Sequence, residues 1–228
     1  MMKVKLISYS QPAPELVDQG IDTIQDLIVY CARVSNPSNQ FNTLTTDKLI
    51  SYLVKNAHWS PFSMATICLE LETTRDISRQ FLRHWSLAQG AQEYSQRYAN
   101  PLVDLDFVLR EARLQDPTNR QNSIDLDMNE DSHRKLAYQW ENCQKLVIEA
   151  AKNAYNWAID HGIAKEQARA VLPEGNTVTR FIINGYVRNW ITYLMVRTQD
   201  GVQKEHRELA REIAKAIHKM FPAIDQFT

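Results

Sequence analysis

The sequence contains few cysteines and few glycines, and each shortage excludes a kind of site. Cys31, Cys68 and Cys143 are odd in number, lie far apart and form no Cys-x-x-Cys pair. We therefore expect neither a disulfide framework nor a zinc site, and no other bound metal. The six glycines include no Gly-x-Gly pair, which excludes the dinucleotide fingerprint and the phosphate loop. A nucleotide bound to this chain must therefore be held by side chains and helix ends.

Long apolar runs and an excess of charge of either sign are also missing. No run approaches the roughly 18 apolar residues that cross a bilayer, and the N-terminus has no apolar leader segment, so we expect a cytoplasmic protein without a membrane partner. Lys and Arg number 26 and Asp and Glu 27, which gives a net charge of −1. Proteins that coat nucleic acid normally carry a basic excess. We therefore expect no nucleic-acid partner, and any phosphate ligand should be small.

Helical periodicity dominates the apolar pattern. It predicts helices over 24–34, 46–56, 74–85, 132–161, 164–171, 185–197 and 202–220. Alternation of apolar and polar residues predicts strands over 3–8, 64–73, 94–99 and 177–183. Strands and helices do not alternate regularly, which favours the α+β class over a doubly wound sheet. We predict one helix-dominated domain over residues 1–228 with a small, mostly antiparallel sheet, and a mobile surface loop over 116–131.

The predicted helix 132–161 carries an apolar stripe. Its members are Leu136, Trp140, Cys143, Val147, Ala151, Ala154 and Ala158. A stripe of this kind normally faces the core of the protein. We therefore expect Cys143 to be a core residue, and we interpret Cys31 and Cys68 in the same way.

Polar and charged groups concentrate in residues 80–98. Arg83, His84 and Arg97 can carry positive charge, Glu93 is a carboxylate, and hydroxyl and amide groups surround them. Such a segment is poorly suited to a core, because each group would need a buried partner. Arginine, in contrast, offers a rigid fork of donors for phosphate oxygens. A solvated helix end followed by a polar loop would have the same composition, so the segment alone leaves both interpretations open.

Two arginines, Arg188 and Arg197, lie on the predicted helix 185–197. At 3.6 residues per turn their spacing is about half a revolution, so they point to opposite sides of the helix. The surrounding residues are largely apolar, which favours a buried or interfacial helix where an unpaired arginine would be expensive. One arginine could extend to solvent. The alternative is a helix that serves two sites or lies between subunits.

These motifs together resemble the flavin-dependent thymidylate synthases. The signature of that family is Arg-His-Arg, a short spacer and Ser, followed closely by Arg-Tyr. This chain has Arg83-His84-Trp85, and Glu-Tyr-Ser-Gln-Arg-Tyr over 93–98. Four further matches occur in the family's order: Ala-Arg-Val-Ser at 32–35, His-Trp-Ser-Pro-Phe at 58–62, Ala168-Arg169 before Leu172-Pro173, and the Arg188 and Arg197 helix. The likeness therefore covers nearly the whole chain.

The resemblance implies a reaction, cofactors and an assembly. Methylenetetrahydrofolate would supply a methylene group to C5 of dUMP, and FAD reduced by NADPH would supply the hydride. The active sites would be built between the subunits of a homotetramer. The implied dUMP contacts are Gln80, Arg83, Glu93, Tyr94, Ser95, Gln96, Arg97, Arg169 and Arg197. The implied FAD contacts are Ser60, Arg83, His84, Trp85, Glu93, Arg188 and Thr192.

Arg197 is the implied catalytic residue, placed against the pyrimidine. A guanidinium stays protonated and cannot act as a base. It can stabilise the N3-deprotonated, enolate-like pyrimidine that makes C5 nucleophilic.

Three positions depart from the family's pattern. Trp85 replaces the second arginine of the signature, Ser63 replaces a glutamate, and two extra residues lie between Arg83 and Ser95. We expect the extra residues, around 87–91, to bulge while 93–98 keeps its place. Two alternatives remain open: a homologue that modifies another pyrimidine nucleotide, for example by hydroxymethylation, and a non-catalytic nucleotide-binding or scaffold protein.

Overall fold

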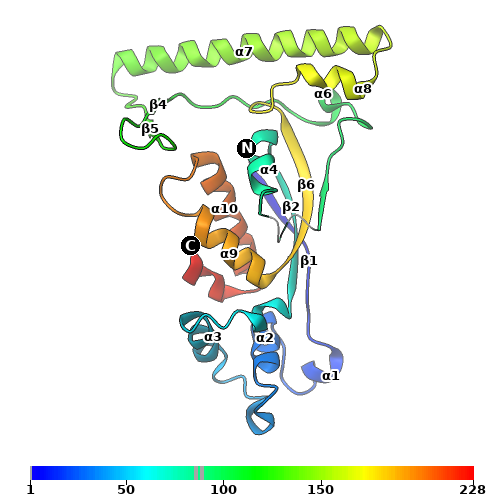
Figure 1. Ribbon diagram of the computed structural model, residues 1–228, viewed down its shortest axis with the longest axis vertical. Coiled ribbons are helices and arrows are strands. Elements are labelled where there is room, and N and C mark those ends of the chain that lie inside the picture. Colours follow the sequence, from blue (N-terminus) through cyan, green and yellow to red (C-terminus); the bar gives the residue numbers. More distant parts are fainter. Residues whose placement is uncertain (1, 85–86, 88–89) are drawn as a thin grey trace.

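An antiparallel sheet runs through the middle of the molecule (Figure 1). The computed structural model describes residues 2–84, 87 and 90–228. The sheet has the strand order β1 (Lys3–Tyr9), β2 (Thr66–Thr74), β6 (Val178–Tyr186) and β3 (Ala91–Glu93). The central strand β2 buries every second residue, as its alternating sequence predicts, and Ile67, Leu69 and Leu71 are inaccessible. The predicted α+β class with a small antiparallel sheet is confirmed.

Helices α4 (Arg75–Phe81), α9 (Val187–Arg197) and α10 (Lys204–His218) lie beside the sheet, and the main core forms between them. Helices α2 (Ile24–Ala32) and α3 (Thr46–Lys55) lie at the lower end of the view in Figure 1. The buried Trp190 ring donates its Nε1 hydrogen to the carbonyl oxygen of Ile67 over 3.0 Å, which ties α9 to the sheet. Leu209, Ile213 and Ile217 of α10 are buried on one face of the helix that the periodicity predicts over 202–220.

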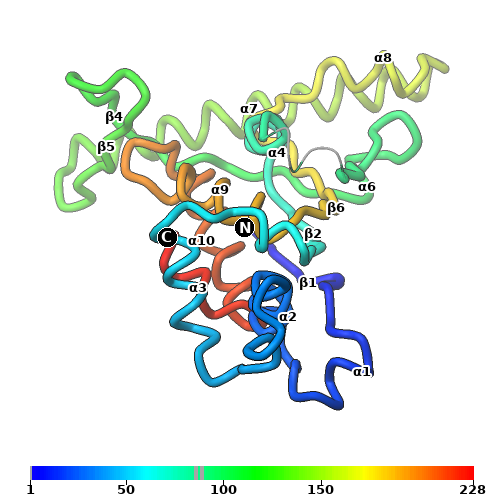
Figure 2. Tube along the Cα trace, turned by 60° about the horizontal axis from the view of Figure 1, so that its bottom comes forward, coloured from blue at the N-terminus to red at the C-terminus, as the bar shows by residue number. Residues whose placement is uncertain are grey.

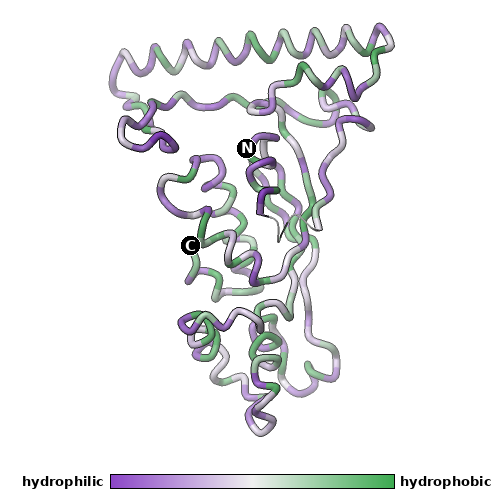
Figure 3. The backbone as a smooth tube through the Cα atoms, viewed as in Figure 1, coloured by the Kyte–Doolittle hydropathy of each residue, from purple (hydrophilic) through white to green (hydrophobic). Residues whose placement is uncertain are grey.

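The longest helix, α7 (Asp131–Asp160), crosses one end of the molecule. The expectation that its stripe is core is wrong for five of the seven residues, because Leu136, Trp140 and Val147 are 41%, 44% and 52% exposed, and Cys143 and Ala154 are exposed as well. Ala151 and Ala158 of the stripe are buried, together with three residues outside it: Gln144, Ile148 and Tyr155. The chain covers only one side of this peripheral helix. Apolar residues recur along its whole length in Figure 3.

Short elements complete the described chain: α1 (Pro14–Val17), α6 (Pro101–Asp104), α8 (Lys165–Ala168), β4 (Arg113–Gln115) and β5 (Ser123–Asp125). Cys31 and Cys68 are half-buried. None of the helices in the described ranges combines the length and the apolar character that a bilayer crossing requires.

One prediction about a connecting segment is wrong, and a second segment has more internal structure than expected. No strand forms over the described residues 94–99. The short strand β3 lies just before this segment and ends at Glu93, and the amides of Tyr98 and Ala99 then donate to the carbonyl of Ser95 in a turn. The segment 116–131 is largely exposed, as expected of a surface loop, but it contains the turn after β4 and the strand β5, which pairs with β4. The Asp116 carboxylate organises its turn by accepting bonds from Thr118, Asn119 and Asn122, and these bonds lower the pKa of Asp116. In Figure 2 the β4–β5 hairpin lies beside the loop that precedes α10. Lys204, the first residue of α10, donates to Asp125 of β5 over 3.1 Å.

The segment with two extra residues is anchored on β6. Leu87 is completely buried, and a Cβ atom at Gly185 would come within 2.3 Å of its side chain. The carbonyl of Gly90 accepts from the amide of Asn184 over 3.3 Å. Gly185 therefore provides the space that Leu87 fills where this segment returns to the sheet.

We predict that Gly185→Ala destabilises the fold by about 1–3 kcal/mol, because the new methyl group overlaps the completely buried Leu87 side chain, which must then shift. Urea denaturation followed by circular dichroism measures the change. Gly175→Ala is the matched control, since a Cβ atom there meets no neighbour within 4 Å. Equal midpoints for both variants would contradict the role assigned to Gly185.

Candidate active site

Arg197 and His84 meet where the C-terminal ends of α4 and α9 converge. Arg197 Nε donates to His84 Nε2 over 2.9 Å. The amide of His84 bonds to the carbonyl of Phe81, which continues the turn of α4. Tyr193 lies one turn before Arg197, and its buried ring packs 5.0 Å from the His84 ring and 4.7 Å from that of Phe81. Aromatic packing thus fixes the position of the His84 ring, which accepts the hydrogen bond from Arg197.

The bond to Arg197 requires a neutral His84. Because Nε2 accepts a hydrogen bond, its lone pair is free of a proton, and we assign the ring proton to Nδ1. Burial, followed by the charges of Arg197 and Arg83, lowers the pKa of His84 from 6.5 to about 4. Burial also lowers the pKa of Arg197, but a guanidinium remains protonated near neutral pH. Among the described residues no carboxylate pairs with Arg197, so its charge remains available to an anionic ligand.

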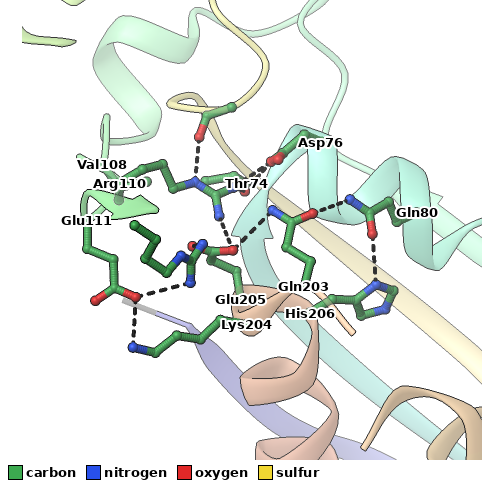
Figure 4. Close-up of polar contacts among 12 residues, drawn as sticks. Thr74, Asp76, Gln80, Val108, Arg110, Glu111, Gln203, Lys204, Glu205 and His206 are labelled. Atoms are coloured by element: carbon green, nitrogen blue, oxygen red, sulfur yellow. Dashed lines mark hydrogen bonds and ion pairs between the residues drawn. The ribbon is translucent and has the colours of Figure 1, made fainter. Parts of the chain in front are cut away.

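Figure 4 shows a hydrogen-bonded relay that ends at His206, whose ring centroid lies 6.4 Å from that of His84. Gln203 Nε2 donates to Glu205 Oε2 over 3.0 Å, and Gln80 Nε2 donates to Gln203 Oε1 over 2.7 Å. Gln80 Oε1 then lies 3.3 Å from His206 Nδ1. The relay therefore connects the last turn of α4 with the first turn of α10 through side chains alone.

Two arginines hold the Glu205 end of the relay. Arg110 Nη1 lies 3.2 Å from Glu205 Oε2, and Arg113 forms an ion pair with the other carboxylate oxygen. Burial opposes ionisation of Glu205, but its own backbone N–H and the two arginines outweigh this effect and lower its pKa. Arg110 also pairs with Asp76 over 2.7 Å. A cavity of about 300 Å³ lies beside Arg110 and Glu205.

A second polar group surrounds Glu93 at the edge of the sheet. Its Oε1 atom accepts from Ser78 over 3.1 Å and from Thr179 over 3.0 Å, and Arg75 Nη1 lies 3.7 Å away. Arg75 is buried, and that nitrogen has no hydrogen-bond partner in the described part of the chain. Burial lowers the pKa of Arg75, Glu93 opposes the shift, and the charge of Arg169 adds to it. Arg169 therefore belongs to the same electrostatic neighbourhood.

Two of the residues that follow Glu93 contact the short helices α6 and α8. The Tyr94 hydroxyl donates to Asp104 over 2.7 Å, and burial together with this carboxylate raises the pKa of Tyr94. Arg97 pairs with Glu166 over 3.2 Å with both side chains half exposed. Gln96 is buried and its Nε2 atom has no partner among the described residues. Ser95 is half-buried. Contacts within the same chain therefore hold Tyr94 against α6 and Arg97 against α8.

The remaining predicted positions lie on an exposed side of the protein. Arg188 and Thr192 are exposed on α9, on the side opposite Arg197, as the sequence predicts. Ser60 is also exposed, in a short turn that packs against α9. A cavity of about 550 Å³ lies between α2 and α3, lined by Ser35, His58 and other residues. Trp85 lies outside the described residues.

The structure thus brings some predicted residues together and leaves others apart. Gln80, His84 and Arg197 lie around one corner with Arg83 beside them, whereas Glu93 belongs to another group, which Arg169 influences only through its charge. Among the described residues no hydrogen bond or ion pair joins the two groups, and none joins either group to Ser60, Arg188 or Thr192.

Sequence reasoning missed most residues of these networks, among them Arg75, Arg110, Gln203, Glu205 and His206. The last three carried a signal, because polar residues crowd the first turn of a predicted helix a few positions after Arg197. Arg110 carried none, because it lies in an irregular segment and its partners are far away in the sequence. Arg75 opens a predicted helix, where a basic residue normally remains in solvent.

Known proteins resemble this chain over most of its length. The family model described as thymidylate synthase complementing protein matches residues 15–223. The probable flavin-dependent thymidylate synthase of Paramecium bursaria Chlorella virus 1 is 41% identical, with 98% of this chain and 97% of that protein covered. The flavin-dependent thymidylate synthase of Synechocystis sp. is 43% identical with the same coverage.

Solved structures share the fold. The crystal structure of a UMP/dUMP methylase, PolB, from Streptomyces cacaoi bound with 5-Br dUMP superposes with a TM-score of 0.76 at 21% identity, covering 99% of this chain and 93% of that one. The family match and the two relatives at 41% and 43% identity lead to one conclusion: the chain belongs to the family of flavin-dependent thymidylate synthases.

Proposed function

We propose that this enzyme is a methyltransferase that converts dUMP to dTMP. Methylenetetrahydrofolate donates the carbon, and FAD reduced by NADPH donates the hydride. The observation that carries the proposal is the Arg197–His84 bond, which presents a guanidinium that no described carboxylate neutralises. Methylation at C5 requires a pyrimidine with anionic, enolate-like character, and a fixed cation stabilises that charge.

Arg197 acts as an electrostatic catalyst. Neutral His84 holds Nε of the guanidinium and leaves both terminal nitrogens for the ligand. A charged histidine at this position would repel the arginine and could not accept its hydrogen. The low pKa of His84 therefore keeps the cation oriented throughout the neutral pH range.

The nucleotide is held by the two polar groups described above. Gln80, Arg83 and Arg197 form one side, and Glu93, Tyr94, Ser95, Gln96, Arg97 and Arg169 form the other. We propose that the site is completed between subunits, because α7 and α9 expose apolar residues that a neighbouring copy can cover. The unpartnered Nε2 of buried Gln96 supports a ligand contact at the second group, since an orphaned buried donor is costly.

The residues present fit a flavin. Ser60, Arg83, His84, Trp85, Glu93, Arg188 and Thr192 are the proposed contacts. Arg188, Thr192 and Ser60 offer exposed donors on neighbouring elements, and the cavity of about 550 Å³ beside His58 and Ser35 offers room for a further part of the cofactor. The bound flavin supplies the hydride, and the protein orients the reacting rings and the charge.

The exposed face of α7 supports a homotetramer, in which residues 1–228 form one domain. Leu136, Trp140 and Val147 recur at the spacing of a helix seam and are exposed in the single chain. Large apolar patches of this kind mark contact surfaces. Met195 and Val196 on α9 are 44% and 53% exposed, so α9 also has an apolar side available to a neighbouring subunit.

The reaction is tested directly with purified protein, dUMP, methylenetetrahydrofolate, NADPH and FAD. We expect dTMP to form, and omission of any single component to abolish it. UMP in place of dUMP tests the alternative pyrimidine substrate. A protein that binds dUMP but forms no product and takes up no flavin would contradict the proposal and favour the non-catalytic alternative.

We predict that Arg197→Ala lowers kcat by about 10²-fold or more, because it removes the cation that stabilises the transition state. Steady-state kinetics with dUMP measures the loss, and size-exclusion chromatography shows that the assembly survives. Arg211→Ala is the control, since Arg211 is an exposed arginine on α10. Full activity of Arg197→Ala would remove this residue from the mechanism.

We predict that Trp140→Glu converts the tetramer to smaller species, because a charge at the centre of the α7 stripe would be buried without a partner. Light scattering coupled to size exclusion measures the mass. The control is Asn153→Glu, which adds the same charge at an exposed position on another face of α7. An unchanged mass for Trp140→Glu would show that the stripe is not a subunit contact.

A further inference from the structure

The relay that contains Gln80 has a single possible direction. Glu205 is an ionised carboxylate and can only accept, so Gln203 must present its amide N–H to it. Gln203 Oε1 then faces Gln80, which must present its own N–H in turn. Gln80 Oε1 is left facing His206 Nδ1, so this nitrogen must carry the ring proton. One buried charge therefore orients two amides and selects one histidine tautomer.

His206 is well suited to end such a relay. It is completely buried, on the first turn of α10. Its ring centroid lies 5.8 Å from that of Tyr193 and 6.4 Å from those of Phe81 and His84. Burial first, then the charges of Arg197, His84 and Arg83, lower its pKa to about 3. His206 is therefore neutral and has one ring N–H, which the relay assigns to Nδ1.

The tautomer that carries its proton on Nδ1 leaves Nε2 of His206 as an unprotonated acceptor. Nε2 is buried and has no hydrogen-bond partner among the described residues. An unsatisfied buried acceptor destabilises a fold, and an apolar side chain of similar size would avoid the cost. The described contacts of His206 offer a single polar compensation, the bond to Gln80. This residue therefore retains a polar ring at a position whose other neighbours are aromatic.

We propose that His206 is a positioning residue that holds the Gln80 amide in place for the nucleotide. Gln203 holds Gln80 Nε2 and His206 holds Oε1, so both ends of the amide are restrained. Each of these two atoms keeps unused capacity: one N–H and one lone pair remain, in fixed positions. Gln80 thus meets its ligand without first losing rotational freedom, which is the advantage of preorganisation. This inference rests on the proposed function, in which Gln80 contacts dUMP.

Two substitutions separate positioning from packing. His206→Leu fills the space but removes the donor, whereas His206→Asn is smaller than the imidazole but keeps an N–H close to the position of Nδ1. We expect His206→Leu to raise the Kd for dUMP roughly fivefold to tenfold, the size of one lost hydrogen bond. We expect kcat at saturating dUMP to stay near the wild-type value. His206→Asn should restore the wild-type Kd, which a purely structural role would not produce.

Calorimetric titration of the flavin-loaded protein with dUMP measures these constants. Gln203→Leu, which releases the opposite end of the amide, should raise the Kd in the same direction, and the double variant with His206→Leu should fall short of additivity. A wild-type Kd in His206→Leu would overturn the inference, and so would equal weakening in the Leu and Asn variants. Failure of the wild-type protein to bind dUMP would overturn the proposed function and this inference with it.

Discussion

The site depends on one hydrogen bond, in which a neutral imidazole accepts from a guanidinium. Arg197 carries a charge that no described carboxylate balances, and His84 can hold it only while His84 itself is uncharged. Burial between α4 and α9, together with the neighbouring arginines, keeps the pKa of His84 at about 4. The aromatic packing of Phe81 and Tyr193 therefore has an electrostatic consequence, because it removes water that would otherwise stabilise the protonated ring.

Two helices of this fold, α9 and α7, have one face packed in their own chain and another face exposed. Helix α9 buries Trp190 and Tyr193, directs Arg197 to one side and leaves Arg188 exposed on the other. Helix α7 buries one apolar face in its own chain and exposes another. Such surfaces are unfavourable for an isolated chain. They suit a protein whose active site is completed between subunits, as we propose.

The sequence predicts the elements that have one clear period. Strand β2 alternates apolar and polar residues, and α10 repeats apolar residues at helical spacing. Each pattern can bury its apolar residues on one face in only one type of secondary structure. Periodicity also finds the stripe on α7 that contains Trp140, but it cannot tell whether the same chain or another copy covers that stripe. The relay was not predictable, because Gln80 and Gln203 meet across 123 positions of the sequence. Gln80 and His84 are four residues apart and so share a helix face, but the closeness of Arg197 to them followed from the family resemblance and from no local pattern.

The central claim is that His84 stays neutral and holds Arg197. The most direct measurement is a pH titration of the histidine ring signals by NMR, with ¹⁵N-labelled histidine and with His84→Gln to assign the signal. We predict a neutral, Nδ1-protonated His84 at pH 7 that titrates at about pH 4. The unfolded chain binds more protons between about pH 6.5 and pH 4, so this group should lower stability as the pH falls through that window. A His84 signal that titrates near the ordinary 6.5 would contradict the account.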